Sequence, residues 1–249
     1  MSKSSNINII SQALLKASKI LRRDFHELEN LQNSLSKIHI FVSRSLANVK
    51  ETLFQELSKA RPDWIIFFHD EVNEVNTKLN CDNIKLLIKP ISGILNYSNG
   101  ISYFTTSVTL INKGLQEAAV IYDPIKDELF YAERGKGAFV NNFRIRTSSN
   151  RDLKNSVIIF ENENLISEKI KLILKEKNAN ARIFGCSCLD FANLAAGRFD
   201  CYISNISSVE SEPGLLLLKE AGGIDSEILD LKETFFYSNN LISEIIKKK

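Results

Sequence analysis

Short apolar runs alternate with turn residues from about Ile84 to Arg146, and this alternation constrains the fold more than any other feature of the chain. The runs have strand length and are separated by turn sequences such as Asn112-Lys113-Gly114 and Asp123-Pro124. This spacing predicts an antiparallel meander and argues against a strict series of strand–helix–strand units. The expected strands cover residues 85–88, 105–111, 115–122, 128–132, 138–140 and 144–146.

Apolar residues with a helical period flank this meander on both sides. Before it we expect helices over about residues 7–35 and 43–60 and a strand over 64–68, followed by an acidic loop over 69–83. After it we expect strands at 156–160, 181–184, 200–203 and 235–237, and helices at 166–177, 187–196, 212–221 and from Leu241 onward. No linker is long enough to separate independent units, so residues 1–249 are expected to form one domain with halves of about 1–146 and 147–249.

Charge and cysteine usage exclude several functional classes. The formal net charge of +2 provides no broad positive field, so there is no strong nucleic-acid signal. No apolar run approaches the ~20 residues of a membrane span, and the N-terminal sequence MSKSSNIN lacks the apolar segment of a secretory signal. We therefore expect a soluble, cytoplasmic protein with no membrane partner. Its four cysteines lack zinc-type spacing and are expected to be free, mostly buried thiols.

The stretch from Leu86 to Leu110 reads as two strands joined by a tight Pro/Gly turn and a short helical turn. Enzymes of the α/β class place ligand chemistry at such turns. A turn that handles a metal or a phosphate is expected to present carboxylates and hydroxyls. Residues 89–94 instead read Lys-Pro-Ile-Ser-Gly-Ile. The sequence thus predicts the architecture of a site that lacks most of the side chains such a site needs.

Four landmarks follow one another along the chain: KPISGILN, YDPIKDELFYAERGKGAFVN, GCSCLDFANLAAGRFD and LLLLKEAGG. Together they resemble the inositol monophosphatase family, most closely its bacterial extragenic-suppressor branch, over nearly the whole chain. The resemblance implies an α/β (α+β) fold arranged as a layered αβαβα sandwich. It also implies a homodimer that hydrolyses phosphate monoesters of inositol or related polyols with Mg²⁺. In such an enzyme carboxylates hold the metal ions that neutralise the phosphate and activate a water molecule.

Transferred position by position, most of the family's metal and catalytic positions fall on residues of the wrong chemistry. The glutamate that follows the first apolar strand falls on His69, and imidazole is a poor ligand for Mg²⁺. The bridging aspartate of the turn falls on Lys89, and its water-positioning threonine falls on Ile94. The family's metal-ligand positions that are degenerate in this sequence are Leu46, His69, Lys89, Ile91 and Ser92.

A few positions keep chemistry that the resemblance assigns to the site. Glu210 retains a carboxylate at the start of a late helix and is the main metal-ligand candidate. Asp70 is a weaker candidate, because one step along an extended chain points a side chain to the other face. By contrast, Ile203 does not keep this chemistry, because it falls where the family has a glutamate that contacts substrate hydroxyls. The candidate positions for substrate or phosphate are Lys89, Ser92, Gly93, Ile94 and Ile203, and the degenerate catalytic positions are His69 and Ile94.

Three functional interpretations follow from this pattern. In the first, the scaffold is kept and the metal centre is lost, so the chain is a pseudophosphatase that acts by binding and needs no cofactor. In the second, the chain is a Mg²⁺-dependent phosphomonoesterase whose ligands have moved to Asp70, Glu71, Asp82 and Glu210. In the third, it is a structural subunit that pairs with an active paralogue in a mixed dimer.

The binding partner under the first interpretation has two candidates. The family resemblance implies a protein of the transcription or antitermination machinery. Local chemistry favours a phosphate-containing small molecule, held by the Lys89 ammonium beside the backbone amides of Gly93 and Ile94. The competing assignment for Lys89 is an internal ion pair with Glu210, and the sequence leaves both open.

Overall fold

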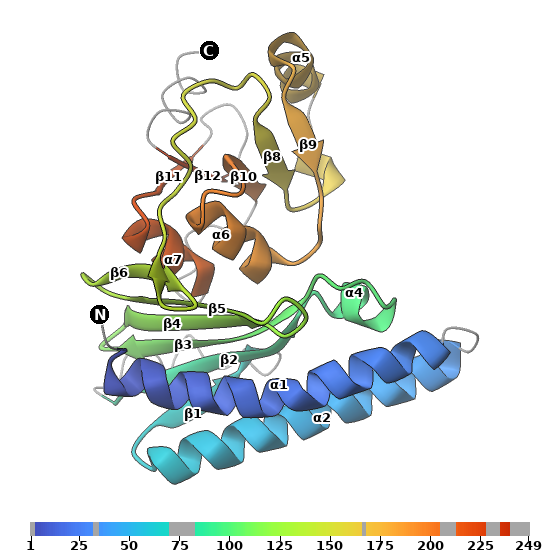
Figure 1. Ribbon diagram of the computed structural model, residues 1–249, viewed down its shortest axis with the longest axis vertical. Coiled ribbons are helices and arrows are strands. Elements are labelled where there is room, and N and C mark those ends of the chain that lie inside the picture. Colours follow the sequence, from blue (N-terminus) through green and yellow to red (C-terminus); the bar gives the residue numbers. More distant parts are fainter. Residues whose placement is uncertain are drawn as a thin grey trace.

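The computed structural model describes residues 3–31, 35–69, 83–165, 168–204, 213–227 and 235–239, and within these ranges the strands form two sheets (Figure 1). The first sheet has the order β1-β2-β3-β4-β5-β6-β7 and the second β11-β12-β10-β8-β9. The strands of the first are β1 (Ile65–Phe68), β2 (Lys85–Ser92), β3 (Thr105–Asn112), β4 (Leu115–Asp123), β5 (Glu128–Glu133), β6 (Gly137–Val140) and β7 (Phe143–Arg144). Those of the second are β8 (Val157–Phe160), β9 (Asn180–Arg182), β10 (Cys201–Ser204), β11 (Ile224–Glu227) and β12 (Phe235–Ser238).

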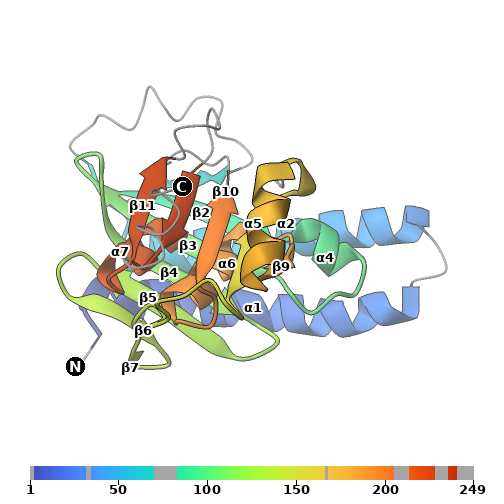
Figure 2. The same ribbon diagram turned by 90° about the horizontal axis from the view of Figure 1, so that it is seen from above.

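Helices separate and cover the two sheets. The helices are α1 (Ser5–Leu31), α2 (Leu35–Ala60), α4 (Ile94–Ser98), α5 (Glu168–Lys177), α6 (Ser187–Ala195) and α7 (Pro213–Glu220). The paired α1 and α2 cover one face of the first sheet, α6 and α7 lie between the sheets, and α5 lies outside the second sheet (Figures 1 and 2). This order of layers is the predicted αβαβα sandwich.

The predicted meander is present, because β2 to β6 each pair antiparallel with the next strand. Only β1 in this sheet is parallel to its neighbour. The turn between β3 and β4 places Lys113 and Gly114 at φ values of 51° and 77°. Two successive positive φ values are typical of the hairpin turn whose twist matches that of the flanking strands. The Asn-Lys-Gly sequence therefore sets this hairpin.

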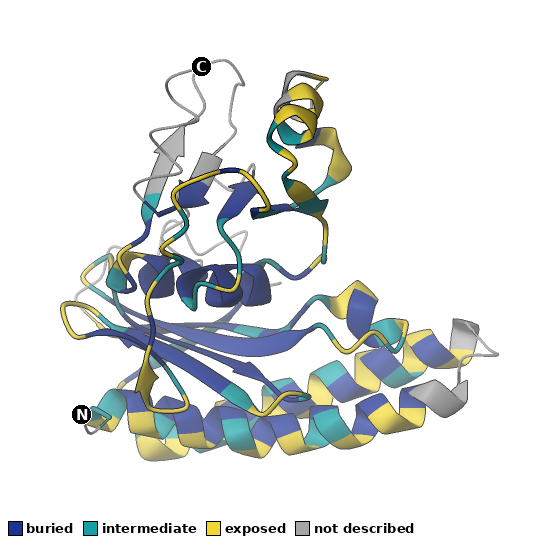
Figure 3. Cartoon of the chain, turned by 45° about the horizontal axis from the view of Figure 1, so that its top comes forward, coloured by how far each residue is buried: buried dark blue, intermediate teal, exposed yellow. Residues whose placement is uncertain are grey.

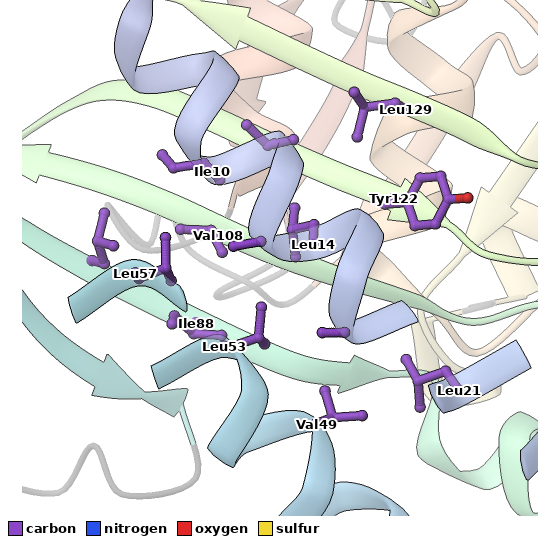
Figure 4. Close-up of a cluster of buried hydrophobic side chains, with 14 of the residues drawn as sticks. Ile10, Leu14, Leu21, Val49, Leu53, Leu57, Ile88, Val108, Tyr122 and Leu129 are labelled. Carbon is purple, nitrogen blue, oxygen red and sulfur yellow. The ribbon is translucent and has the colours of Figure 1, made fainter. Parts of the chain in front are cut away.

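Both faces of the first sheet are buried, which explains why both orientations of β4 carry apolar residues from Ala118 to Tyr122 (Figure 3). In β4, Val120 and Tyr122 face α1 and α2, while Ala119 and Ile121 face α6 and α7. An antiparallel sheet with one solvated face would alternate apolar and polar residues instead. Figure 4 shows the α1/α2 side of this core, where the labelled residues are Ile10, Leu14, Leu21, Val49, Leu53, Leu57, Ile88, Val108, Tyr122 and Leu129.

The turn between β5 and β6 is held by a carboxylate from the far end of the chain. The backbone N–H groups of Gly135 and Gly137 each donate to the carboxylate of Glu220, at 2.8 Å. Glu220 is the last residue of α7. The basic, glycine-rich sequence of this turn therefore anchors the meander to α7.

Several predicted boundaries are wrong. The second helix begins at Leu35 and not near residue 43, because the buried positions Ile38 and Val42, four residues apart, already continue its helical spacing. The strand predicted at 181–184 is β9, a three-residue edge strand at Asn180–Arg182. The strand predicted at 144–146 is β7, at Phe143–Arg144.

Strand β11 was not predicted, because its sequence Ile-Asp-Ser-Glu shows no run of apolar or β-branched residues, and it forms by pairing with β12. Most of the predicted acidic loop and the predicted helix from Leu241 lie outside the described residues. Across the described ranges, no helix has the length and apolar character needed to cross a membrane.

Candidate functional site

The carboxyl ends of β1 and β2 bring two predicted site residues together. The strands are parallel, and Phe68 pairs in register with Ile88. His69 and Lys89 each follow one of these residues, so they lie at the same level on neighbouring chains, which are about 4.8 Å apart in a sheet. His69 is exposed and Lys89 is half-buried. The two positions that the resemblance predicts as metal ligands therefore lie at one level of neighbouring chains and carry an imidazole and an ammonium.

A bulge near the end of β2 shapes the turn. The pairing of β2 with β3 shifts register between Lys89 and Ser92. Pro90 lies inside this shift, and proline has no backbone N–H to give to a neighbouring strand. Bulges of this kind bend a strand and re-aim its side chains. The Lys-Pro-Ile-Ser sequence therefore builds the predicted turn geometry.

Gly93 is required where the turn leaves the sheet. Its φ of +81° lies in the left-handed region, and a Cβ there would lie 3.0 Å from both Cys186 Cβ and Tyr103 O. The chain then enters α4, a helix of five residues. Its first residue, Ile94, is 45% exposed, so the turn presents an apolar side chain to solvent where the family has a threonine.

Two polar side chains of α4 fix it in place. Asn96 Nδ2 donates to the carbonyl oxygens of Tyr103 at 2.8 Å and Phe184 at 2.7 Å. The hydroxyls of Tyr97 and Ser45 form a hydrogen bond at 2.8 Å, which ties α4 to α2. The turn is thus held from both halves of the chain. The sequence analysis did not identify either residue, because nothing local signals contacts across such long separations.

Cys186 packs against the turn from the start of α6. Its Sγ donates to Ser92 O at 3.3 Å and lies 3.5 Å from Ser92 Oγ. Burial raises the pKa of the Cys186 thiol to about 11. Because the thiolate is the form that attacks or binds metal, this thiol is inert at neutral pH. Cys186 and Cys188 are buried thiols outside any disulfide among the described residues, as predicted from the sequence.

A carboxylate close to the turn is already engaged in structure. Tyr103 OH donates to Asp190 Oδ1 at 2.7 Å, and Asn193 Nδ2 donates to Tyr103 OH at 3.3 Å. Burial, followed by the negative charge of Asp190, raises the pKa of Tyr103. Asp190 is 1% exposed, so its carboxylate stabilises the packing of α6 beneath the turn.

The remaining predicted residues pack into the hydrophobic cores, lie on α2 or fall outside the described ranges. Leu46 is half-buried on α2, directly after the Ser45 that bonds α4, and Ile91 packs against the α1/α2 core. Ile203 is 4% exposed and packs with Phe160 and Cys201 in the core of the second sheet. Residues 70–82 and 205–212 are not described, and they contain Asp70, Glu71, Asp82 and Glu210.

The donor set at the described part of the turn does not fit Mg²⁺. This ion prefers carboxylate, carbonyl and water oxygens in octahedral geometry. The side chains supplied here are the ammonium of Lys89, the imidazole of His69 and the buried hydroxyl of Ser92. In the described ranges, no three His, Cys, Asp or Glu side chains lie together as a metal-binding group. The side chains of the described turn thus include one ammonium and no carboxylate.

Comparisons with known proteins agree with the sequence landmarks. The family profile described as "Inositol monophosphatase family" matches residues 3–243. The inositol-1-monophosphatase of Rhizobium meliloti is 35% identical over 231 residues, which cover 90% of this chain and 85% of that protein. Nus factor SuhB of Pasteurella multocida is 30% identical over 227 residues, covering 88% of this chain and 83% of its own.

The fold has a close match among solved structures. The crystal structure of the extragenic suppressor protein suhB from Bartonella henselae superposes with a TM-score of 0.78 at 30% identity, covering 99% of this chain and 98% of that one. The match extends over both sheets and the helices between them. The chain therefore belongs to the inositol monophosphatase family.

Proposed function

We propose that this chain is a catalytically inactive member of its family that acts by binding. The observation that carries the proposal is Lys89, which stands at the end of β2 where the family resemblance places a metal-bridging aspartate. Two unit positive charges ~4 Å apart repel by ~4 kcal/mol at the effective dielectric of a partly buried site. A divalent ion would be repelled more strongly, so Lys89 opposes the catalytic metal directly.

The neighbouring replacements support the same conclusion. Ser92 lacks the charge of the family's second aspartate, and Ile94 lacks the hydroxyl of its threonine. The bulge, Gly93 and the two anchored residues of α4 preserve the shape of the turn. A retained scaffold with altered side chains favours recognition over catalysis, since function depends on the site and not on the fold.

The proposal predicts no phosphatase activity. In a phosphate-release assay with inositol 1-phosphate and other phosphate esters at millimolar Mg²⁺, turnover should not exceed that of the buffer. The Rhizobium meliloti relative, assayed in parallel, serves as the positive control. Turnover by this chain that is abolished in Glu210→Ala would contradict the proposal, because it would identify a working metal site.

The ligand that we propose for the turn is a phosphate group held by Lys89. The helix α4 has only five residues, so its N-terminal amides add little and the ammonium supplies most of the attraction. Lys89→Ala should lower the affinity for inorganic phosphate about tenfold in a calorimetric titration without metal, while Lys136→Ala, on the distant β5–β6 turn, should leave it unchanged. Equal affinity in Lys89→Ala and the parent would instead favour an internal ion pair with Glu210.

We further propose a protein partner of the transcription machinery, supported by the relatives named Nus factor SuhB. A homodimer is part of this proposal, and a mixed dimer with an active paralogue is the alternative. Co-purification from the source cell distinguishes them: transcription proteins in the complex support the first, and a phosphatase paralogue as the sole partner supports the second.

A second candidate function is a Mg²⁺-dependent phosphomonoesterase with relocated ligands. It is favoured by the 35% identity to a protein named inositol-1-monophosphatase. Its ligands would be Asp70, Glu71, Asp82 and Glu210, all outside the described residues. Calorimetry with Mg²⁺ or Mn²⁺ decides this candidate, since no binding of either ion excludes it.

A further inference from the structure

A charged cavity of about 740 Å³ lies along α1 and shares no lining residue with the turn after β2. Its α1 residues recur every three or four positions and therefore occupy one face of the helix. They include Lys16, Lys19, Arg22, Arg23 and His26. Glu56 of α2 borders the cavity on one side, and Tyr122 and Asp127 border it at the end of β4, where Tyr122 lies beside α1 (Figure 4).

The lining of this α1 cavity is positively charged overall. Four lysine and arginine side chains stand against two carboxylates, which leaves a formal charge of +2 with His26 neutral. Lys16 Nζ lies 2.5 Å from Glu56 Oε1, and Arg22 Nη2 lies 3.9 Å from Asp127 Oδ1. Lys19 is exposed and forms no ion pair with the described residues. Arg23 Nη2 lies 2.7 Å from Oδ1 of Asp24, which stands outside the lining, so three of the four cations have a carboxylate partner and Lys19 supplies the available charge.

Arg22 connects the cavity to the sheet. Its Nη2 donates to Tyr122 OH at 2.8 Å, and Tyr122 OH in turn donates to Asp127. Its Nε is buried and has no hydrogen-bond partner among the residues that the structure describes. A buried donor without a partner costs free energy, and a small rotation toward an anion would satisfy it. The bond from Nη2 to Tyr122 therefore positions the guanidinium, while its Nε donor has no partner among the described residues.

We propose that the α1 cavity binds a small molecule that carries at least two phosphate groups. Its volume lies within the ~300–1,000 Å³ of small-molecule sites. Successive cations on one helix face are separated by about 4.5–6 Å along the axis, so the two phosphates of a linked pair can each contact a different cation, which adds contacts that a single phosphate lacks. Arginine binds phosphate through two parallel hydrogen bonds, and Lys19 adds a point charge.

The carboxylates at the rim argue for a compact ligand. A long nucleic-acid backbone laid along α1 would place phosphates beside both Glu56 and Asp127. Like charges held close together repel, whereas a small ligand can displace Glu56 from Lys16 and stay clear of Asp127. The proposal therefore commits to a small phosphorylated molecule.

Calorimetric titration of the full chain with inorganic pyrophosphate, in EDTA, tests the proposal. In the Lys89→Ala background, which lacks the phosphate site proposed at the turn, we expect one site that binds pyrophosphate at least ~10-fold more tightly than orthophosphate. Lys19→Gln combined with Arg22→Gln should weaken binding at least ~10-fold, and the exposed single change Lys19→Glu should weaken it in the same direction without burdening the fold. Glu56→Gln should tighten binding about threefold, because it releases Lys16.

Matched variants control for general charge effects. Lys171→Gln with Lys175→Gln removes two exposed cations from α5 and should leave pyrophosphate affinity unchanged. Glu133→Gln breaks a pair of the same 2.5 Å length, with Lys136, and should also have no effect. Lys89→Ala should not change pyrophosphate binding. The experiment can therefore reject the α1 cavity without rejecting the proposed phosphate site at the turn, and the reverse.

Four results would overturn the proposal: no pyrophosphate binding, an equal loss of affinity in the α5 control, binding that is removed by Lys89→Ala, or displacement of pyrophosphate by a tighter-binding RNA oligonucleotide.

Discussion

Gly214→Ala is expected to lower the free energy of unfolding by about 3 kcal/mol. Gly214 is the second residue of α7, where a Cβ would lie 2.1 Å from Phe191 Cβ and 2.6 Å from Phe191 Cγ. Phe191 is fully buried in α6, so its Cβ can move only if the helix moves. The packing penalty therefore exceeds the ~1 kcal/mol that alanine gains over glycine inside a helix. Equilibrium denaturation in urea measures the difference.

Gly222→Ala is the control for this change. In the described part of the chain, no atom beyond its two chain neighbours lies within 4 Å of a Cβ at Gly222, and its φ of +89° is what opposes substitution. A single left-handed alanine costs about 1 kcal/mol. If Gly214→Ala lost no more stability than Gly222→Ala, α6 and α7 would not be as closely packed as the structure indicates.

Asn96→Ala is expected to cost about 2 kcal/mol of stability and to loosen the turn after β2. The substitution leaves the carbonyl oxygens of Tyr103 and Phe184 without the donor that joins them. Buried groups that lose a partner cost about 1–3 kcal/mol. Because Cys186 packs against the same turn, its thiol should also react faster with an alkylating reagent, as followed by mass spectrometry of the peptide that contains it.

Asn99→Ala provides the comparison on the same segment. Asn99 also donates through Nδ2 to a backbone carbonyl, that of Leu95 at 2.8 Å, but it is exposed, so water can replace the bond. Its loss should change stability by less than ~0.5 kcal/mol and leave Cys186 unreactive. Indistinguishable behaviour of the two variants would mean that Asn96 does not hold the turn.

Much of the fold was predictable because its signals are local. Asn112-Lys113-Gly114 specifies a hairpin through its own backbone preferences, and the Lys-Pro-Ile-Ser sequence marks a bulge through proline. Strand β11 was not predictable in this way, because its sequence has little strand character and pairing with β12 determines its conformation. The start of α2 was missed because Ile40 and Phe41 stand between the core positions Ile38 and Val42 and obscure the helical period.

For the candidate site, too, the residues with local sequence signals were predictable and the long-range contacts were not. Lys89, Ser92 and Ile94 were located from the sequence because they occupy one short motif. The contacts of Ser92 with Cys186 and of Asn96 with Phe184 span 94 and 88 residues, and no local pattern encodes them. The basic face of α1 is visible in the spacing of Lys16, Lys19 and Arg23, but an ordinary solvated helix has the same spacing, and only the cavity distinguishes the two.

The bonds from Glu220 to the β5–β6 turn have a consequence for how the protein is made. When the ribosome has completed the meander, the residues that cover its second face have not yet been synthesised; that face includes Ala119, Ile121, Phe130, Ala132 and Ala138. At 5–20 residues per second, roughly 4–15 s pass before α7 emerges. During that interval the nascent chain carries an open apolar surface. We therefore expect neither half to be stable alone. We also expect the nascent chain to depend on chaperones until its last helices have been synthesised.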